Sequence, residues 1–385
     1  MTYKEYVMED ALEALIDYRG KTPKKSNSGI PTLSAKSVKN NQINYSECYY
    51  ISPDEYKRFM VRGFPKKGDL LLTTEAPLGM VARLDRDDVA IAQRLLTLRG
   101  KKDVLDNDYL LYLLQSPYGQ GLLKAKETGT TVTGIKQAEF RKIIVKLPDI
   151  EIQQKIGSIL RSIDDKISIN QKINDNLQQQ AAAIFANFYD RAETEVGFTE
   201  IIQILSGGTP KTGESSYWNG NVPFFTPKDV GSPYTLTTEK TITEEGLSHC
   251  NSRLYPVNTV FVTARGTVGK VGLPGIPMAM NQSCYALVGK DTHQLLVYFY
   301  TLKAVDRLKH KASGAVFDAI TTRDFESEII MKLSDDDAKD FLDVAEPIYQ
   351  AVLSNSIENL RLAALRDSLL PKLMSGEIDV SNIQL

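Results

Sequence analysis

The side chains best suited to catalysis are few, and they form no constellation. The chain has three histidines, all in its second half: His249, His293 and His310. The glycine-rich run GTVGK (266–270) lacks the spacing of a phosphate-binding loop, and the similar run APLGM (76–80) has no lysine, so we expect turns between strands. Paired acids such as Asp164 and Asp165 fit a solvated helix face. We therefore expect no catalytic residue in this chain.

The composition excludes several classes of protein. Hydrophobic residues make up 42% of the 385 residues and charged residues 24%, as in soluble globular proteins, and no apolar run approaches the ~20 residues that a membrane span needs. Acids stand at the N-terminus where a signal peptide would be basic, so we expect a cytoplasmic protein. Three scattered cysteines without a CxxC pair predict neither disulfides nor a metal site.

The chain contains an internal repeat. Six segments of the first half return in the same order in the second: GKTPK (20–24) as GGTPK (207–211), IPTLSAKSV (30–38) as VPFFTPKDV (222–230), LLLTTEAPLGMV (70–81) as VFVTARGTVGKV (260–271), AIAQR (90–94) as AMNQS (279–283), DYLLYLLQS (108–116) as HQLLVYFYT (293–301), and TGTTVTGIKQAEF (128–140) as SGAVFDAITTRDF (313–325). Such self-similarity predicts two homologous globular modules. Short Val/Leu/Thr strands in the middle of each module and two short helices at its end predict an α+β fold.

The modules alternate with two segments of another kind, which divides the chain into 1–147, 148–197, 198–333 and 334–385. Their formal net charges are +6, −3, +1 and −6, which add up to the −2 of the whole chain. Relatively basic modules and acidic connecting segments suit surfaces that face different partners.

Both connecting segments predict a long helix with a narrow apolar seam. Apolar residues recur every three or four positions between 150 and 190, with Ile173 among them, and a shift of 185 places this seam on apolar residues of the second segment. We expect the helices to pair through these positions: Ile156, Ile163, Ile167, Asn170, Leu177, Ile184, Phe341, Ile348, Val352, Asn355, Leu362 and Leu369. The two asparagines would fix register if buried, and the alternative is an exposed asparagine on a bent helix. Ser334 and Asp337 predict a capping box.

Because a module separates the two helices, antiparallel pairing is the simplest arrangement. It predicts a dumbbell with approximate twofold symmetry, whose modules stand at the ends of a rod of roughly 60 Å. Pro371 lies inside the last turns of the second helix. We expect it to bend or fray them so that Leu369, Leu370, Leu373 and Met374 fold over the first module or a partner; the alternative is a helix that ends near Leu370.

Three stretches of the chain carry a family resemblance: LPDIEIQQKIGSILRSIDDKI (147–167), SGGTPKTGESSYWNGNVPFFTPKDV (206–230) and LRDSLLPKLMSGEIDV (365–380). Together with the duplicated module and the two helices, they resemble the specificity (S) subunits of type I restriction-modification enzymes over nearly the whole chain. The first module lacks an equivalent of SYWNGNVPF (216–224), so a shorter recognition loop is expected there.

The resemblance implies two target-recognition domains, each reading one half of a split sequence in double-stranded DNA. It implies helices that set the unread gap and dock two modification (M) subunits. S-adenosylmethionine is then expected on the M subunits, and ATP and Mg on the restriction (R) subunits, with no cofactor and no active site on this chain. The alternatives are a scaffold or adaptor on the same fold that binds no DNA, and a hydrolase, which the missing constellation disfavours.

Reading of base edges would fall to exposed polar side chains. Arg, Asn and Gln pair bidentately with guanine and adenine, while Lys more often meets phosphate. Under the resemblance, the candidates are Lys21, Lys24, Lys25, Lys36, Lys39 and Arg94 in the first module, and Lys211, Trp218, Asn219, Lys228, Arg265, Asn281 and Gln282 in the second. For each of them, ordinary solvated surface is the alternative.

Overall fold

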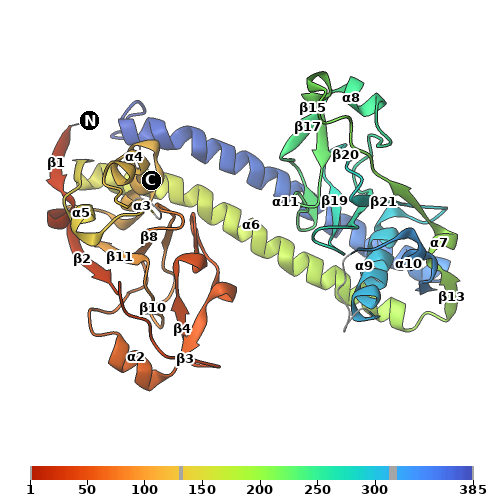
Figure 1. Cartoon of the computed structure of the whole chain (residues 1–385), viewed down its shortest axis with the longest axis horizontal. Coiled ribbons are helices and arrows are strands. Elements are labelled where there is room, and N and C mark those ends of the chain that lie inside the picture. Colours follow the sequence, from red (N-terminus) through yellow and green to blue (C-terminus); the bar gives the residue numbers. More distant parts are fainter. Residues whose placement is uncertain (1, 130–132, 312–318, 384–385) are drawn as a thin grey trace. The chain divides into compact units, whose positions relative to one another are not determined.

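The computed structural model describes residues 2–129, 133–311 and 319–383, and the chain divides into two compact units. Unit 1 comprises Met1–Ile167 and Arg361–Leu385, and unit 2 comprises Ser168–Leu360. Each unit therefore contains one module together with parts of both long helices (Figure 1). The division into four segments made from the sequence stays a prediction.

Unit 1 is built on short, mostly antiparallel strands. A four-stranded sheet has the order β2-β11-β8-β9: β2 (Leu12–Asp17), β11 (Leu95–Gly100), β8 (Leu70–Thr73) and β9 (Val81–Arg83). A second has the order β10-β4-β7-β3, with β10 and β4 parallel: β10 (Ala90–Ile91), β4 (Ile30–Leu33), β7 (Tyr49–Ile51) and β3 (Lys25–Ser26). Two further pairs join β1 (Tyr3–Val7) to β12 (Ile144–Pro148) and β5 (Val38–Lys39) to β6 (Gln42–Ile43).

Unit 1 also contains short helices, and local caps set several of their ends. The short ones are α1 (Met8–Ala11), α2 (Pro53–Phe59), α3 (Asn107–Gln115), α4 (Pro117–Ala125) and α5 (Gln137–Arg141), with 3-10 turns at η1 (Ala35–Ser37) and η2 (Tyr45–Glu47). Asp106 caps α3 by accepting from the amide of Tyr109 at 2.9 Å. Ser116 follows α3 and caps α4, whose first residue is proline, so one serine both separates the two helices and starts the second.

Unit 2 repeats this plan. Its main sheet has the order β14-β21-β18-β19-β16: β14 (Ile202–Ser206), β21 (Cys284–Gly289), β18 (Val260–Thr263), β19 (Val271–Pro274) and β16 (Tyr234–Thr235). A second sheet and a strand pair are formed by β17 (Lys240–Ile242), β15 (Trp218–Phe225) and β20 (Ala279–Met280), and by β13 (Thr194–Gly197) with β22 (Ile329–Lys332). The remaining elements before the last helix are α7 (Phe198–Ile201), η3 (Ser215–Tyr217), α8 (Glu244–Ser248), α9 (Gln294–Lys311) and α10 (Thr322–Glu326).

The two units thus share one topology, which confirms the prediction of two homologous α+β modules. The strand order β2-β11-β8-β9 corresponds to β14-β21-β18-β19, and the parallel pair β4–β10 corresponds to β15–β20. Of the matched segments, Gly314 and its neighbours lie outside the described residues. Most of the stretch that the first module lacks lies in β15, which has eight residues where β4 has four. A shorter recognition loop in the first module stays a prediction.

Two helices of 41 residues each, α6 (Ile150–Asp190) and α11 (Asp335–Ser375), supply parts to both units. In unit 1, Asp164 of α6 contacts Arg366 of α11, while Ile156 shares a buried cluster with Leu373. In unit 2, Asn174 contacts Asn355, and Phe185 packs on Phe341 with ring centroids 5.3 Å apart. Since residue numbers rise along one helix as they fall along the other, the helices run antiparallel within each unit, as predicted.

Candidate nucleic-acid interface and helix pair

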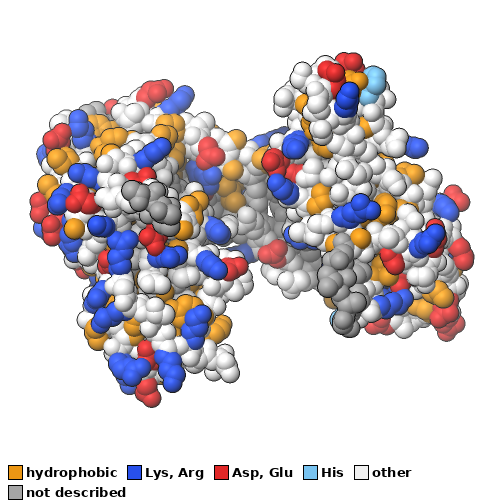
Figure 2. Space-filling view, viewed as in Figure 1, with side chains coloured by type: hydrophobic (Ala, Val, Ile, Leu, Met, Phe, Trp, Pro, Cys, Tyr) orange, Lys and Arg blue, Asp and Glu red, His pale blue; other side chains and the backbone are white. Residues whose placement is uncertain are grey.

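All six predicted DNA-contacting residues of unit 1 are exposed. Five are lysines: Lys21 and Lys24 between β2 and β3, Lys25 in β3, Lys36 in η1 and Lys39 in β5. Lys25 lies over the ring of Tyr49, with Nζ 4.8 Å from the centroid. Figure 2 shows Lys and Arg side chains spread among acidic ones over the visible face of this unit. Exposed lysines of this kind can contact phosphate oxygens, which positions a protein on DNA without reading its sequence.

The sixth residue, Arg94, is already engaged within unit 1. It follows β10 with a φ of 71°, and its Nε lies 2.7 Å from Oε1 of Glu75. Arg19 approaches the other oxygen of the same carboxylate at 3.6 Å. Arg94 would have to leave Glu75 to pair with a base, so its role in reading DNA stays a prediction.

In unit 2, the structure brings three of the predicted residues together. Arg265 follows β18, and its amide donates to the carbonyl of Ser283 at 3.3 Å. Asn281 and Gln282 immediately precede that serine; Oδ1 of Asn281 accepts from the Ser283 amide at 3.1 Å, and Oε1 of Gln282 accepts from the Thr209 hydroxyl. An arginine beside two amides offers donors and acceptors of the kind that distinguish base edges.

The other four residues of unit 2 lie apart from that group in the hydrogen-bond pattern. Trp218 begins β15 and donates from Nε1 to the carbonyl of Lys211 at 3.3 Å. Asn219 is exposed with a φ of 61°, and Lys228 is exposed with Nζ 3.7 Å from Glu239. A role of these four residues in binding DNA stays a prediction.

The glycine-rich run at 266–270 is a turn between antiparallel strands, as expected. It joins β18 to β19, and the hydroxyl of Thr263 accepts from the amide of Lys270 at 2.9 Å. Thr73 does the same for Met80, also at 2.9 Å, in the corresponding turn between β8 and β9. Gly79 and Gly269 both have positive φ, at 92° and 73°. The matched Thr and Gly positions therefore maintain the geometry of these two turns.

The paired helices meet along the predicted seam, but its middle differs from the expectation. Ile156, Ile163, Phe341 and Val352 are buried, whereas Ile167, Leu177, Ile184, Ile348, Asn355, Leu362 and Leu369 are partly buried. Ile173 is 42% exposed and lies off the seam. Leu160, Asn174 and Ala181, which the sequence reasoning did not place there, are buried. An alternating step of four and three residues from 156 would have selected them.

Four asparagines form a polar layer in unit 2, and we call them the asparagine layer: Asn170, Asn174, Asn355 and Asn359. Asn170 is 1% exposed and donates to Asn359 at 2.9 Å and to Glu358 at 2.7 Å. Asn355 donates to Asn174 at 2.8 Å. The 185-residue shift relates the two contacts to each other. Burial of Asn170 confirms the first of the two predicted alternatives for that residue, whereas Asn355 is only partly buried. A role of the two asparagines in fixing register stays a prediction.

A polar contact in unit 1, which we call the polar clamp, joins the module to both helices. Its members are Asn41, Tyr112, Asp164 and Arg366. Oδ2 of Asp164 accepts from Asn41 Nδ2 at 2.8 Å and from the Tyr112 hydroxyl at 2.6 Å, while Oδ1 accepts from Arg366 at 2.7 Å. Burial, followed by the Asp164 charge, raises the pKa of Tyr112, so its hydroxyl stays a donor. Burial opposes the charge of Arg366, yet hydrogen bonds with Asp164 and Asp367 raise its pKa.

The corresponding place in unit 2 holds an aromatic cluster: Tyr234, Tyr298, Phe299 and Tyr349. Tyr349 stands 185 residues after Asp164, and its ring lies 5.7 Å from Phe299, 5.6 Å from Tyr298 and 6.4 Å from Tyr234. Burial raises the pKa of Tyr298 to about 12. Edge-to-face contacts between these rings attach α11 to the module of unit 2, whereas hydrogen bonds to the Asp164 carboxylate attach α6 to the module of unit 1.

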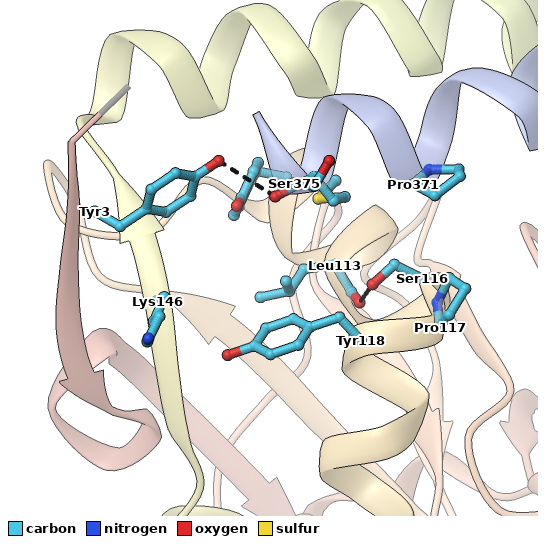
Figure 3. A pocket seen from close by; sticks show the side chains of 10 residues that line it. Tyr3, Leu113, Ser116, Pro117, Tyr118, Lys146, Pro371 and Ser375 are labelled. Atoms are coloured by element: carbon cyan, nitrogen blue, oxygen red, sulfur yellow. Dashed lines mark hydrogen bonds between the residues drawn. The ribbon is translucent and has the colours of Figure 1, made fainter. Parts of the chain in front are cut away.

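The last turns of α11 pack onto the first module, as predicted, but the fraying expected at Pro371 is wrong. The helix continues through Pro371 to Ser375, so it does not end near Leu370. Leu370, Leu373 and Met374 are buried in the same cluster as Leu113. Figure 3 shows Pro371 at the rim of an apolar cavity of 430 Å³ bounded also by Tyr118, Lys146 and Tyr3, whose hydroxyl donates to the carbonyl of Met374 at 3.3 Å.

Ser334 caps the start of α11 as predicted, although the Asp337 carboxylate accepts from the Ser334 hydroxyl and not from its backbone amide as a capping box requires. The hydroxyl of Ser334 accepts from the amide of Asp337 at 3.1 Å and donates to its carboxylate at 3.0 Å. Asp337 also pairs with Arg191 at 2.8 Å. Asp335 and Asp336 are exposed. Two of the three acids at this end are therefore available to a partner.

Most of the chain matches a described family of domains. Residues 8–179 and 194–332 match the profile described as the type I restriction modification DNA specificity domain. The chain belongs to the type I restriction-modification specificity subunits.

Relatives of this subunit match over most of their length. It is 24% identical to the type I restriction enzyme MjaIX specificity subunit of Methanocaldococcus jannaschii, over 92% of this chain and 88% of that protein. It is also 24% identical to the HindI specificity subunit of Haemophilus influenzae, over 90% of this chain and 94% of that protein. The crystal structure of the type I S subunit from M. genitalium has the same fold, with a TM-score of 0.61 and 15% identity over 97% of this chain and 96% of that one.

The described part of the chain offers neither a cluster of metal ligands nor a membrane-spanning helix. No group of three or more His, Cys, Asp or Glu side chains among residues 2–129, 133–311 and 319–383 is arranged to hold a metal ion. In the same ranges no helix has the length and apolar character needed to cross a membrane.

Proposed function

We propose that each module of this specificity subunit reads one half of a bipartite sequence in double-stranded DNA. The observation that carries the proposal is the repetition of one topology in both units, within a chain that matches the DNA specificity domain twice. Two equivalent surfaces on one polypeptide suit two separated half-sites. Exposed lysines would bind phosphates, and the group of Arg265, Asn281 and Gln282 would reach base edges.

The helices are proposed to set the unread gap and to dock two M subunits. Exposed apolar side chains on their outer faces support docking: Ile169 and Ile173 on α6 are 52% and 42% exposed, and Leu360 and Leu365 on α11 are 46% and 47% exposed. The exposed acids Asp335 and Asp336 would favour a basic partner surface. Catalysis is proposed to reside elsewhere: S-adenosylmethionine on the M subunits, ATP and Mg on R subunits.

Binding assays with and without the M subunit test DNA reading. The chain, alone and co-purified with its M subunit, is titrated into fluorescent randomised duplexes at several salt concentrations. We expect weak binding by the chain alone, tight sequence-selective binding by the complex, and an affinity that falls linearly on a log–log salt plot. Methylome sequencing of a host that expresses both subunits should reveal two conserved half-sites. A complex without sequence preference would favour the adaptor alternative.

Docking has its own test. Ile169→Asp with Ile173→Asp places charge on the proposed contact and should abolish co-purification of the M subunit. Ala182→Asp with Ala183→Asp adds the same two charges at other exposed positions of α6 and is the control. Charge reversal is best confined to Asp335 and Asp336, because the carboxylate of Asp337 accepts from the capping Ser334 hydroxyl and pairs with Arg191. Co-purification of the isoleucine double variant at the wild-type level would exclude the proposed face.

A further inference from the structure

The β5–β6 hairpin of unit 1 has little structure of its own. It consists of two residue pairs, Val38 with Ile43 and Lys39 with Gln42, and its turn contains Asn41 at a φ of 60°. An isolated ribbon of this size is not stable in water. Its position must therefore come from contacts with the rest of the unit.

Those contacts lead from the hairpin turn to the long helices. The amide of Asn41 donates to the carbonyl of Val81 at 3.1 Å, which fixes the turn to β9. Its side-chain Nδ2 donates to Asp164 on α6 at 2.8 Å, and its Oδ1 accepts from Gln115 on α3. The turn is thus held on three sides, and one of them is a helix proposed to dock a partner subunit.

Asp164 is fully committed to this arrangement. It accepts from Asn41, Tyr112 and Arg366, and its side chain is only 15% exposed. Arg366, at 21% exposure, belongs to α11, so the carboxylate ties the hairpin to both helices. Hydrogen bonds to a charged acceptor are strong and directional. The orientation of the hairpin relative to α6 and α11 therefore depends on the hydrogen bonds that Asp164 accepts.

The hairpin also carries a predicted DNA contact. Lys39 is exposed on β5 next to the turn, and Lys36 is exposed in η1 just before it. Val230–Pro233, the matching stretch of unit 2, runs into β16, where Tyr234 packs on Tyr349 of α11. The means of fixing this segment to the helices therefore differs between the units.

We infer that Asp164 is a positioning residue for DNA reading: it orients the β5–β6 hairpin against the helix pair, and so governs discrimination at the half-site read by the first module only. The inference rests on the proposed function. Its particular content is that one carboxylate controls one half of the target, because unit 2 fixes the corresponding segment by aromatic packing.

The bipartite target supplies an internal control. The complex with the M subunit is prepared with wild-type chain, with Asp164→Asn and with Asn41→Ala, and each is selected on a randomised duplex library. Both variants should lose roughly tenfold in discrimination at one half-site and none at the other. Lys39→Ala should weaken binding through the same module. Asp165→Asn, an exposed neighbour on α6, should behave as wild type.

The outcomes separate the inference from the proposed function. If the wild-type complex selects no sequence, the proposed function fails. If it selects two half-sites and the variants lose discrimination equally at both, or at neither, the positioning role is overturned. Should Asp164→Asn not assemble, Asn41→Ala decides, since it leaves the pair of Asp164 and Arg366 in place.

Discussion

The two units solve one packing problem with different chemistry. At equivalent positions of the long helices, unit 1 has Asp164 and unit 2 has Tyr349. The first collects three directional hydrogen bonds, and the second contacts three aromatic rings. A charged network depends on each partner, because removing one leaves another buried without compensation, whereas ring packing is distributed over many atoms. The difference teaches that one pair of helices can attach two homologous modules by contacts that differ in their sensitivity to the loss of a single partner.

The largest expected effect lies in the aromatic side of the comparison. Phe341→Ala removes a fully buried ring that packs on Phe185 and Phe299, and should destabilise unit 2 by about 3–5 kcal/mol. Trp218, the single tryptophan of the chain, lies in unit 2, so its fluorescence during urea unfolding reports this unit. Val344→Ala on the same helix, 45% exposed, is the matched control. A loss below about 1 kcal/mol would contradict this account of the packing.

A slightly smaller effect is expected when the polar clamp is broken. Asp164→Leu leaves Arg366 without its main partner and should cost about 3 kcal/mol in unit 1, measured by hydrogen exchange of the β8 and β9 amides. Asp164→Leu combined with Arg366→Leu should regain much of that loss, because both charges are then gone. Equal destabilisation by the single and the double variant would show that the ion pair is not the source of the effect.

The asparagine layer should respond at an intermediate level. Asn170→Leu removes the amide that donates to Asn359 and Glu358 and should cost about 1–3 kcal/mol in unit 2, as seen by Trp218 fluorescence. Adding Asn359→Leu should recover part of the stability at the expense of a unique register. Strictly additive losses would argue against a shared layer.

The smallest effect gives the sharpest contrast between the units. Tyr112→Phe and Tyr349→Phe each delete one hydroxyl, but the first donates to a carboxylate and the second is hydrogen-bonded to Tyr298. We expect about 2 kcal/mol for Tyr112→Phe and about 1 kcal/mol for Tyr349→Phe. Raising the salt concentration should narrow the gap by weakening the charged contact. Identical values at low salt would remove the distinction between the two junctions.

The sequence predicted most of the architecture because its signals are repeated or local. Ordered matches between the halves gave the two modules, helical periodicity gave α6 and α11, and Ser334 with Asp337 gave a helix start. The seam was misplaced at Ile173 because large apolar residues were counted, whereas Asn174 and Ala181 follow the true spacing.

The polar clamp could not be predicted from sequence in the same way. Asn41 and Asp164 are 123 positions apart, and no local pattern links an asparagine in a turn to an acid on a distant helix. Asp164 looked like a solvated pair with Asp165, which holds only for its exposed neighbour. The sequence comparison did not reveal that Asp164 and Tyr349 occupy equivalent positions, because the repeat keeps the position along the helix while the side chains differ in chemistry.

The carboxylate of Asp164 also limits which modules from other proteins could be attached to this helix pair. A foreign module transplanted onto these helices would meet a charged socket that demands an amide and a phenol at defined points. A transplanted module with aliphatic residues at those points would leave Asp164 without two of its three hydrogen-bond donors, and its orientation on the helices would be less well defined. Compatible chimeras should therefore be chosen by their complement to this one acid.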